Sequence, residues 1–148
     1  MASSDFTPRW PAYLRLPCFV PVPMRSRRDG WTAERQGAFV GWLAETGSVA
    51  EAAARAGCSR ESAYRLRRRD GARGFVAAWD VAASAGVSGD ASGKFTQDEL
   101  RDAAFGGVVH VVMRRGRFLH CRVEPSNSAL VALMRQFIRS GGRKGRAR

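Results

Sequence analysis

Residues 49–69 have the sequence VAEAAARAGCSRESAYRLRRR, and this stretch decides the fold of the chain. Two helices that cross steeply need a small residue at their contact, a residue tolerant of positive φ in the turn, and apolar inward positions on the second helix. Ala53 meets the first need, Gly57 the second and Leu66 the third. The spacing therefore predicts a helix-turn-helix unit whose second helix covers residues 60–69.

The surrounding sequence predicts a small helical domain at residues 30–85. Thr32, Ser48 and Ser59 are candidate N-cap residues, and Ser48 with Glu51 has the spacing of a capping box. Trp42 and Leu43 fall on one helical face, and Phe75, Val76 and Trp79 on another, so these side chains are expected to close one core. We expect four helices, at residues 33–45, 49–56, 60–69 and 75–83.

The second helix of the unit is strongly basic. Residues 60–73 contain six Arg against two acidic residues, on the helix that a helix-turn-helix places in the major groove. The alternative without DNA binding is a helical hairpin whose charged face is simply solvated. Tyr64 is open to two roles, contact with DNA or packing on Arg stems. Charge and spacing together predict that DNA contacts come from Ser59, Arg60, Glu61, Tyr64, Arg65, Arg67, Arg68 and Arg69.

The composition of the whole chain agrees with a polyanionic partner. The 148 residues carry a formal net charge of +12, and all but two of the 25 basic residues are Arg. Arg stays charged at any working pH, and its planar fork of donors fits phosphates and guanine edges. We expect double-stranded DNA as the partner.

The sequence also excludes membrane-spanning and secreted proteins. No apolar run approaches the roughly 18 to 20 residues of a membrane span, and prolines interrupt the N-terminal stretch where a signal peptide would lie. The three Cys are widely spaced and form no CxxC pair, which favours a reducing cytoplasm over an oxidising compartment. We expect no metal and no cofactor.

The rest of the chain divides into segments of different composition. Residues 1–29 hold five of the six prolines and read as an extended basic arm, and residues 86–95 read as a Gly/Ser linker. Residues 96–139 predict an assembly module of helix, β-hairpin and helix, with Gly116 in the hairpin turn, and residues 140–148 form a basic tail. The expected fold is mainly α, with a helix-turn-helix bundle and this small α+β module.

Two stretches resemble a known family. RRDGWTAERQGAFVGWLAETGSVAEAAARAGCSRESAYRLRRR followed by GFVAAWDVA resembles the N-terminal helix-turn-helix domain of phage terminase small subunits and related prophage-derived proteins. FGGVVHVVMRRGRFLHCRVEPSNSALVALMRQF is similar to their later strand, basic turn, strand and Leu-rich helix. The resemblance implies a non-catalytic homo-oligomer that recognises viral DNA and hands it to a large ATPase and nuclease subunit. It implies DNA-facing roles for Arg60, Tyr64, Arg65 and Arg68.

The sequence supports an enzyme less well than a DNA-binding protein. Glu99 fits a capping box with Thr96, so the acids near it need not hold a metal ion. His110 and His120 fall on neighbouring predicted strands without a carboxylate or Cys pair beside them. We expect no enzyme. A transcriptional regulator that binds operator DNA as a dimer remains an alternative to the packaging role, and a basic protein-binding adaptor is a third.

Overall fold

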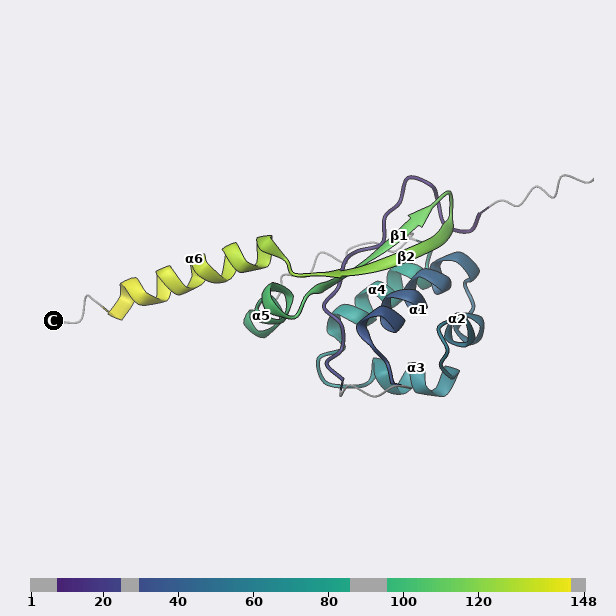
Figure 1. Cartoon of the computed structure of the whole chain (residues 1–148), viewed down its shortest axis with the longest axis horizontal. Helices are drawn as coiled ribbons and strands as arrows, with labels where there is room; N and C mark the ends of the chain where they lie inside the picture. Colours follow the sequence, from purple (N-terminus) through teal and green to yellow (C-terminus); the bar gives the residue numbers. More distant parts are fainter. Residues whose placement is uncertain (1–7, 25–29, 86–95, 145–148) are drawn as a thin grey trace, which may run out of the picture.

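The computed structural model describes residues 8–24, 30–85 and 96–144 (Figure 1). The elements in chain order are α1 (Ala33–Thr46), α2 (Val49–Arg55), α3 (Arg60–Arg67), α4 (Arg73–Ala83), α5 (Gln97–Phe105), β1 (Val108–Arg114), β2 (Arg117–Glu124) and α6 (Asn127–Lys144). The expected linker and the basic residues 25–29 lie outside the described residues. The described chain is mainly helical with one two-stranded antiparallel sheet, as expected.

Helices α1 to α4 surround an aromatic core. The ring centroids of Phe39 and Trp79 are 4.7 Å apart, and those of Phe39 and Phe75 are 5.9 Å apart. Leu43 is fully buried with them, as expected. Trp42 is half-buried at the edge of this core and also packs against Phe118 of the hairpin.

The helix starts follow the capping signals in the sequence. An N-cap side chain accepts a hydrogen bond from the backbone N–H three residues on at Thr32, Ser48, Ser59 and Thr96. Thr96 also completes the capping box with Glu99. The capping box expected at Ser48 is half formed, because the carboxylate of Glu51 pairs with Arg55 at 2.7 Å.

Strands β1 and β2 form the predicted hairpin. Arg115 and Gly116 occupy its turn with φ of 52° and 78°. Two consecutive residues with positive φ are the signature of a two-residue type I′ turn, whose twist matches the strands it joins. The register shifts by one residue between Val112 and Met113.

The hairpin packs on α1 of the helical domain. A Cβ atom on Gly37 would lie 2.7 Å from Cγ1 of Val109, and one on Gly41 would lie 2.6 Å from Cε2 of Phe118. The two glycines, one turn apart, give α1 a flat face on which the strands lie. This face covers the apolar side of a hairpin that would be marginal by itself in water.

Residues 8–24, the described part of the expected extended arm, pack into the body of the protein. Trp10, Phe19 and Val22 are almost fully buried, and Phe19 pairs with Val109 of β1 through two backbone hydrogen bonds. The buried Gln36 side chain holds Val22 at both its backbone N–H and its carbonyl. Prolines restrict the backbone to extended shapes, but the apolar residues between them are part of the core.

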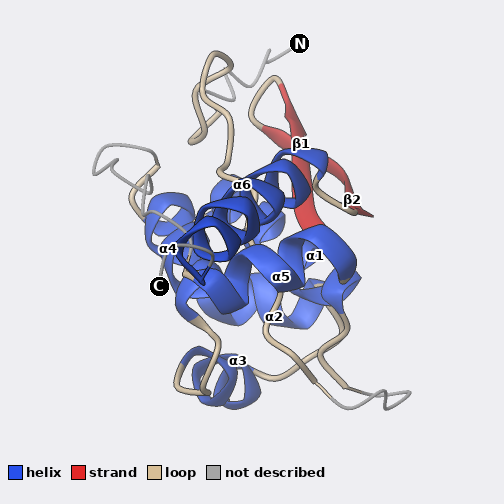
Figure 2. Cartoon of the chain, turned by 90° about the vertical axis from the view of Figure 1, so that its left-hand side faces the viewer, coloured by secondary structure: helices blue, strands red, loops and turns tan. Residues whose placement is uncertain are grey.

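Helices α5 and α6 pack together at one side of the body (Figures 1 and 2). Leu100, Ala103, Ala104 and Ala129 form a small cluster with Val108. Helix α6 continues to Lys144, into the expected basic tail, and it projects away from the body (Figure 1). Among the described helices, none is long and apolar enough to cross a membrane.

Candidate nucleic-acid interface

The turn between α2 and α3 depends on one small residue and one glycine. Ala53 is fully buried, and its carbonyl accepts a hydrogen bond from the Cys58 backbone N–H at 2.8 Å. Gly57 has φ of 80°, and a Cβ there would meet no atom within 4 Å. Glycine therefore serves the backbone conformation rather than close packing. The positive φ of Gly57 is the backbone conformation expected of a glycine in this turn.

Helix α3 is buried on one side and open on the other. Ala63 and Leu66 point into the core with exposures of 0% and 1%. At 100° per residue, positions 61, 65 and 68 fall on the opposite side and position 60 at its edge. The exposed residues among the predicted contacts are Ser59, Arg60, Glu61, Arg65, Arg68 and Arg69. In both views α3 lies on the far side of the body from the hairpin (Figures 1 and 2).

Tyr64 takes part in packing. It is half-buried, and its ring centroid lies 5.3 Å from that of Trp79. The guanidinium carbon of Arg60 lies 5.7 Å from the centre of the Tyr64 ring. The tyrosine therefore joins the core to the exposed face and supports Arg60 through a cation–π contact.

Arg67 differs from its arginine neighbours. Its guanidinium donates to Oδ1 of Asp80 at 2.9 Å and lies 5.1 Å from the centre of the Trp79 ring. Its Nη1 atom is buried without a hydrogen-bond partner among the described residues. The structure thus sets Arg67 apart from the exposed arginines, because α4 already holds its side chain.

Arg9 is a structural arginine that sequence reasoning missed. Its guanidinium donates to the carbonyls of Leu43, Ala44 and Ala82 at 3.0 Å each, and also to the carbonyl of Ala83. These carbonyls lie at the C-terminal ends of α1 and α4, where the helix dipole favours a cation. Those of Leu43 and Ala82 also accept backbone N–H groups, from Gly47 and Ala85. Burial lowers the pKa of Arg9 from its ordinary value. No sequence signal distinguishes this arginine from one that contacts DNA.

Groups capable of metal binding or catalysis are not gathered in the described part of the chain. No cluster of three or more His, Cys, Asp or Glu side chains occurs there. His110 pairs in register with Arg122, and His120 pairs with Val112, so the two imidazoles are not opposite each other. Glu99 serves the cap of α5 and lies 3.6 Å from Arg73.

Two of the cysteines lie in apolar surroundings. Burial raises the pKa of the Cys58 thiol and, with the nearby Glu34, raises that of Cys121. The Cys121 thiol donates to the backbone carbonyl of Glu34 at 3.2 Å. Since the thiolate is the reactive form, both groups are weak nucleophiles at neutral pH.

Comparison with protein-family models, with curated proteins and with solved structures finds no match to this chain.

Proposed function

We propose that this protein binds double-stranded DNA, with α2 and α3 acting as a helix-turn-helix unit and α3 entering the major groove. The observation that carries the proposal is the exposed side of α3, where Arg60, Arg65 and Arg68 surround Glu61 on a helix whose other side is buried. A helix with its side chains is about 10–12 Å wide, which fits a major groove about 12 Å wide.

The exposed residues divide into two roles. Arg60, Glu61 and Arg65 lie in the first two turns of α3, the part of a recognition helix that reaches base edges. Arg68 and Arg69 follow at the C-terminal end, where they hold phosphates. Three predicted contacts remain, and they act indirectly: Ser59 caps α3, Tyr64 positions Arg60, and Arg67 anchors α3 to α4.

The biological setting is a proposal from sequence resemblance. The similarity to terminase small subunits favours a packaging protein in the cytoplasm of a bacterial host, which assembles into an oligomer and passes viral DNA to a large ATPase and nuclease subunit. A second candidate is a transcriptional regulator that binds a palindromic operator as a dimer. The uncovered apolar face of α6 supports this second candidate, because it suits pairing between two copies of the chain.

A comparison of two duplexes tests the assignment of α3. One duplex carries a site selected from a random pool, and the other has random sequence. Arg65→Ala should weaken binding to the selected site by about tenfold or more, the effect of losing one bidentate base contact, and should weaken binding to random duplex less. Equal losses would assign Arg65 to a phosphate.

Arg122→Ala is the matched control for this comparison. It removes the same charge from the exposed surface of the hairpin, on the far side of the body from α3 (Figure 1). It should weaken binding to both duplexes slightly and equally. Failure of the wild-type protein to bind either duplex would refute the proposal.

A further inference from the structure

The outer face of α6 is strongly apolar and exposed. Met134 is 57% exposed, Phe137 80% and Ile138 70%, and Leu130 is also exposed. Scattered single apolar residues on a surface need no explanation, but a contiguous apolar strip marks an interaction site. No described residue of the chain covers this strip.

The strip has the spacing of a helix-pairing seam. Leu130, Met134, Phe137 and Gly141 follow one another at intervals of four, three and four residues, which keeps them on one side of α6. A Cβ on Gly141 would meet no atom within 4 Å, so a small, open position ends the seam. At 100° per residue, Arg135 and Arg139 fall away from the seam.

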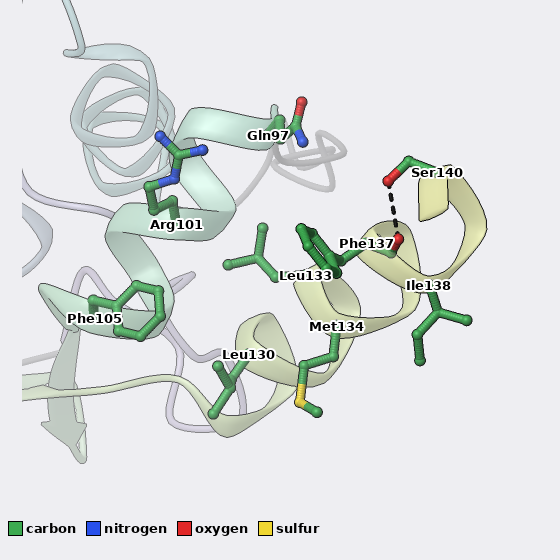
Figure 3. Close-up of a pocket in the computed structure, with 9 residues that line it drawn as sticks. All are labelled: Gln97, Arg101, Phe105, Leu130, Leu133, Met134, Phe137, Ile138 and Ser140. Carbon is green, nitrogen blue, oxygen red and sulfur yellow. Dashed lines mark hydrogen bonds between the residues drawn. The ribbon is translucent and has the colours of Figure 1, made fainter. Parts of the chain in front are cut away.

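The base of the seam opens into a hollow beside α5. The hollow measures about 350 Å³, and Phe105 and Arg101 of α5 face Leu130, Leu133 and Phe137 of α6 across it (Figure 3). Beyond this hollow α6 projects into solvent (Figure 1). An occupant of the seam would therefore bury the projecting half of α6 and fill the hollow at its base.

We propose that this occupant is the α6 helix of a second copy of the chain, paired antiparallel about a two-fold axis between Met134 and Phe137. In this register Met134 lies opposite Phe137 of the second copy, and Leu130 lies opposite Gly141 of the second copy. At each end of the paired helices the large Leu130 side chain thus meets the small Gly141. At the centre the large Met134 and Phe137 side chains meet. The interface is self-complementary, as two-fold symmetry requires.

The shape of the molecule selects the antiparallel arrangement. The body lies at one end of α6, and the view along α6 shows it surrounding the line of the helix (Figures 1 and 2). A parallel pair would place the two bodies at the same end, where they would overlap. An antiparallel pair places them at opposite ends of the joined helices.

Charge also favours a second copy. Helix α6 contains Arg135, Arg139 and other basic residues and no acidic residue, whereas α5 carries three acidic residues, Asp98, Glu99 and Asp102, against the single basic residue Arg101. Antiparallel pairing brings the basic C-terminal half of α6 toward α5 of the other copy. The proposal does not depend on DNA binding, because pairing uses a separate face and is measured without DNA.

Two single substitutions test the pairing and its direction. Met134→Lys and Phe137→Glu each alter a side chain that is mainly solvent-exposed in the single chain. Each places two charges in the apolar seam of a symmetric dimer, so each should weaken dimerisation by about a hundredfold or more. Light scattering gives the mass, and circular dichroism checks that helicity is retained.

Mixing the two variants should restore the dimer. In the antiparallel register one Lys–Glu pair replaces one apolar contact, and the other contact between Met134 and Phe137 is intact. Gln136→Lys, on the far side of α6, is the control and should dimerise like the wild type. A monomeric wild type, an assembly larger than a dimer, or a mixture that stays monomeric would overturn the proposal.

Discussion

Gly41 of α1 lies directly beneath the ring of Phe118, so a methyl group at this position tests how the hairpin is docked. A Cβ on Gly41 would lie 2.6 Å from Cε2 of Phe118, well inside the usual carbon contact distance of about 3.5–4.0 Å. The ring must therefore move away from α1. Its edge-on contact with Trp42, at 5.1 Å between ring centroids, would be weakened or lost.

The size of the effect follows from three contributions. Replacing Gly by Ala inside a helix stabilises it by about 1 kcal/mol. Overpacking costs about 1–3 kcal/mol, and an aromatic pair is worth about 0.5–1.5 kcal/mol. Gly41→Ala should therefore lower the free energy of unfolding by about 1–2 kcal/mol, as measured by urea denaturation.

The effect of Gly41→Ala on the free energy of unfolding should reverse its sign when the Phe118 ring is absent. In a Phe118→Ala background the three ring atoms nearest to the added methyl group are gone, so Gly41→Ala should stabilise by up to about 1 kcal/mol. Gly141→Ala is the control for helix propensity, because no atom lies within 4 Å of its added Cβ, and it should not destabilise. Equal effects of Gly41→Ala in both backgrounds would refute the docking of the hairpin on α1.

Three further predictions concern Gly57 in the turn between α2 and α3, Arg67 between α3 and α4, and the thiols of Cys58 and Cys121. Gly57→Ala should cost about 1–2 kcal/mol in urea denaturation, since an L residue is strained at φ of 80°, and Gly57→Asn should cost less. Arg67→Met should lower the free energy of unfolding by about 1–2 kcal/mol through its lost ion pair and ring contact, while binding of random duplex falls less than for Arg68→Ala. Burial raises the pKa of the Cys58 and Cys121 thiols, so the unfolded state loses these protons first and stability should fall as pH rises past a thiol's ordinary pKa. The fall in the free energy of unfolding between pH 7.5 and 9.5 should be smaller in the variant Cys58→Ala/Cys121→Ala than in the wild type. An equal fall in both proteins would contradict this prediction.

Local signals predicted the elements that depend on near neighbours. Ser59 and Thr96 accept the hydrogen bonds that N-cap residues accept, and Gly57 and Gly116 adopt the positive φ that their turns require. These features involve residues within a few positions of one another. Sequence spacing is therefore enough to place them.

Contacts between distant parts of the chain were not predictable in this way. Trp10 and Phe19 sit among prolines without periodicity, so nothing local indicates that they are buried against β1 and the helices. Gly37 and Gly41 look in sequence like weak points of a helix, although they make the face on which the hairpin lies. Burial of this kind depends on which surfaces meet in three dimensions.

The candidate site shows the same division. Spacing placed Arg60 and Arg65 on the outward side of α3, where the structure has them exposed. Charge counting placed Arg67 among those contacts and gave Arg9 no role, but the structure holds the Arg67 guanidinium against α4 and that of Arg9 against the ends of α1 and α4. Which arginine is free depends on acceptors far away in the sequence.

The salt dependence of duplex binding tests most directly the claim that the exposed side of α3 contacts DNA. Each phosphate contact contributes about 0.9 to the slope of log affinity against log salt. For the double variant Arg68→Ala/Arg69→Ala we predict a slope shallower by about two, measured by fluorescence anisotropy. The control Arg114→Ala/Arg122→Ala removes the same charge from the hairpin and should leave the slope nearly unchanged. An unchanged slope in the α3 variant, or an equal change in both, would contradict the account.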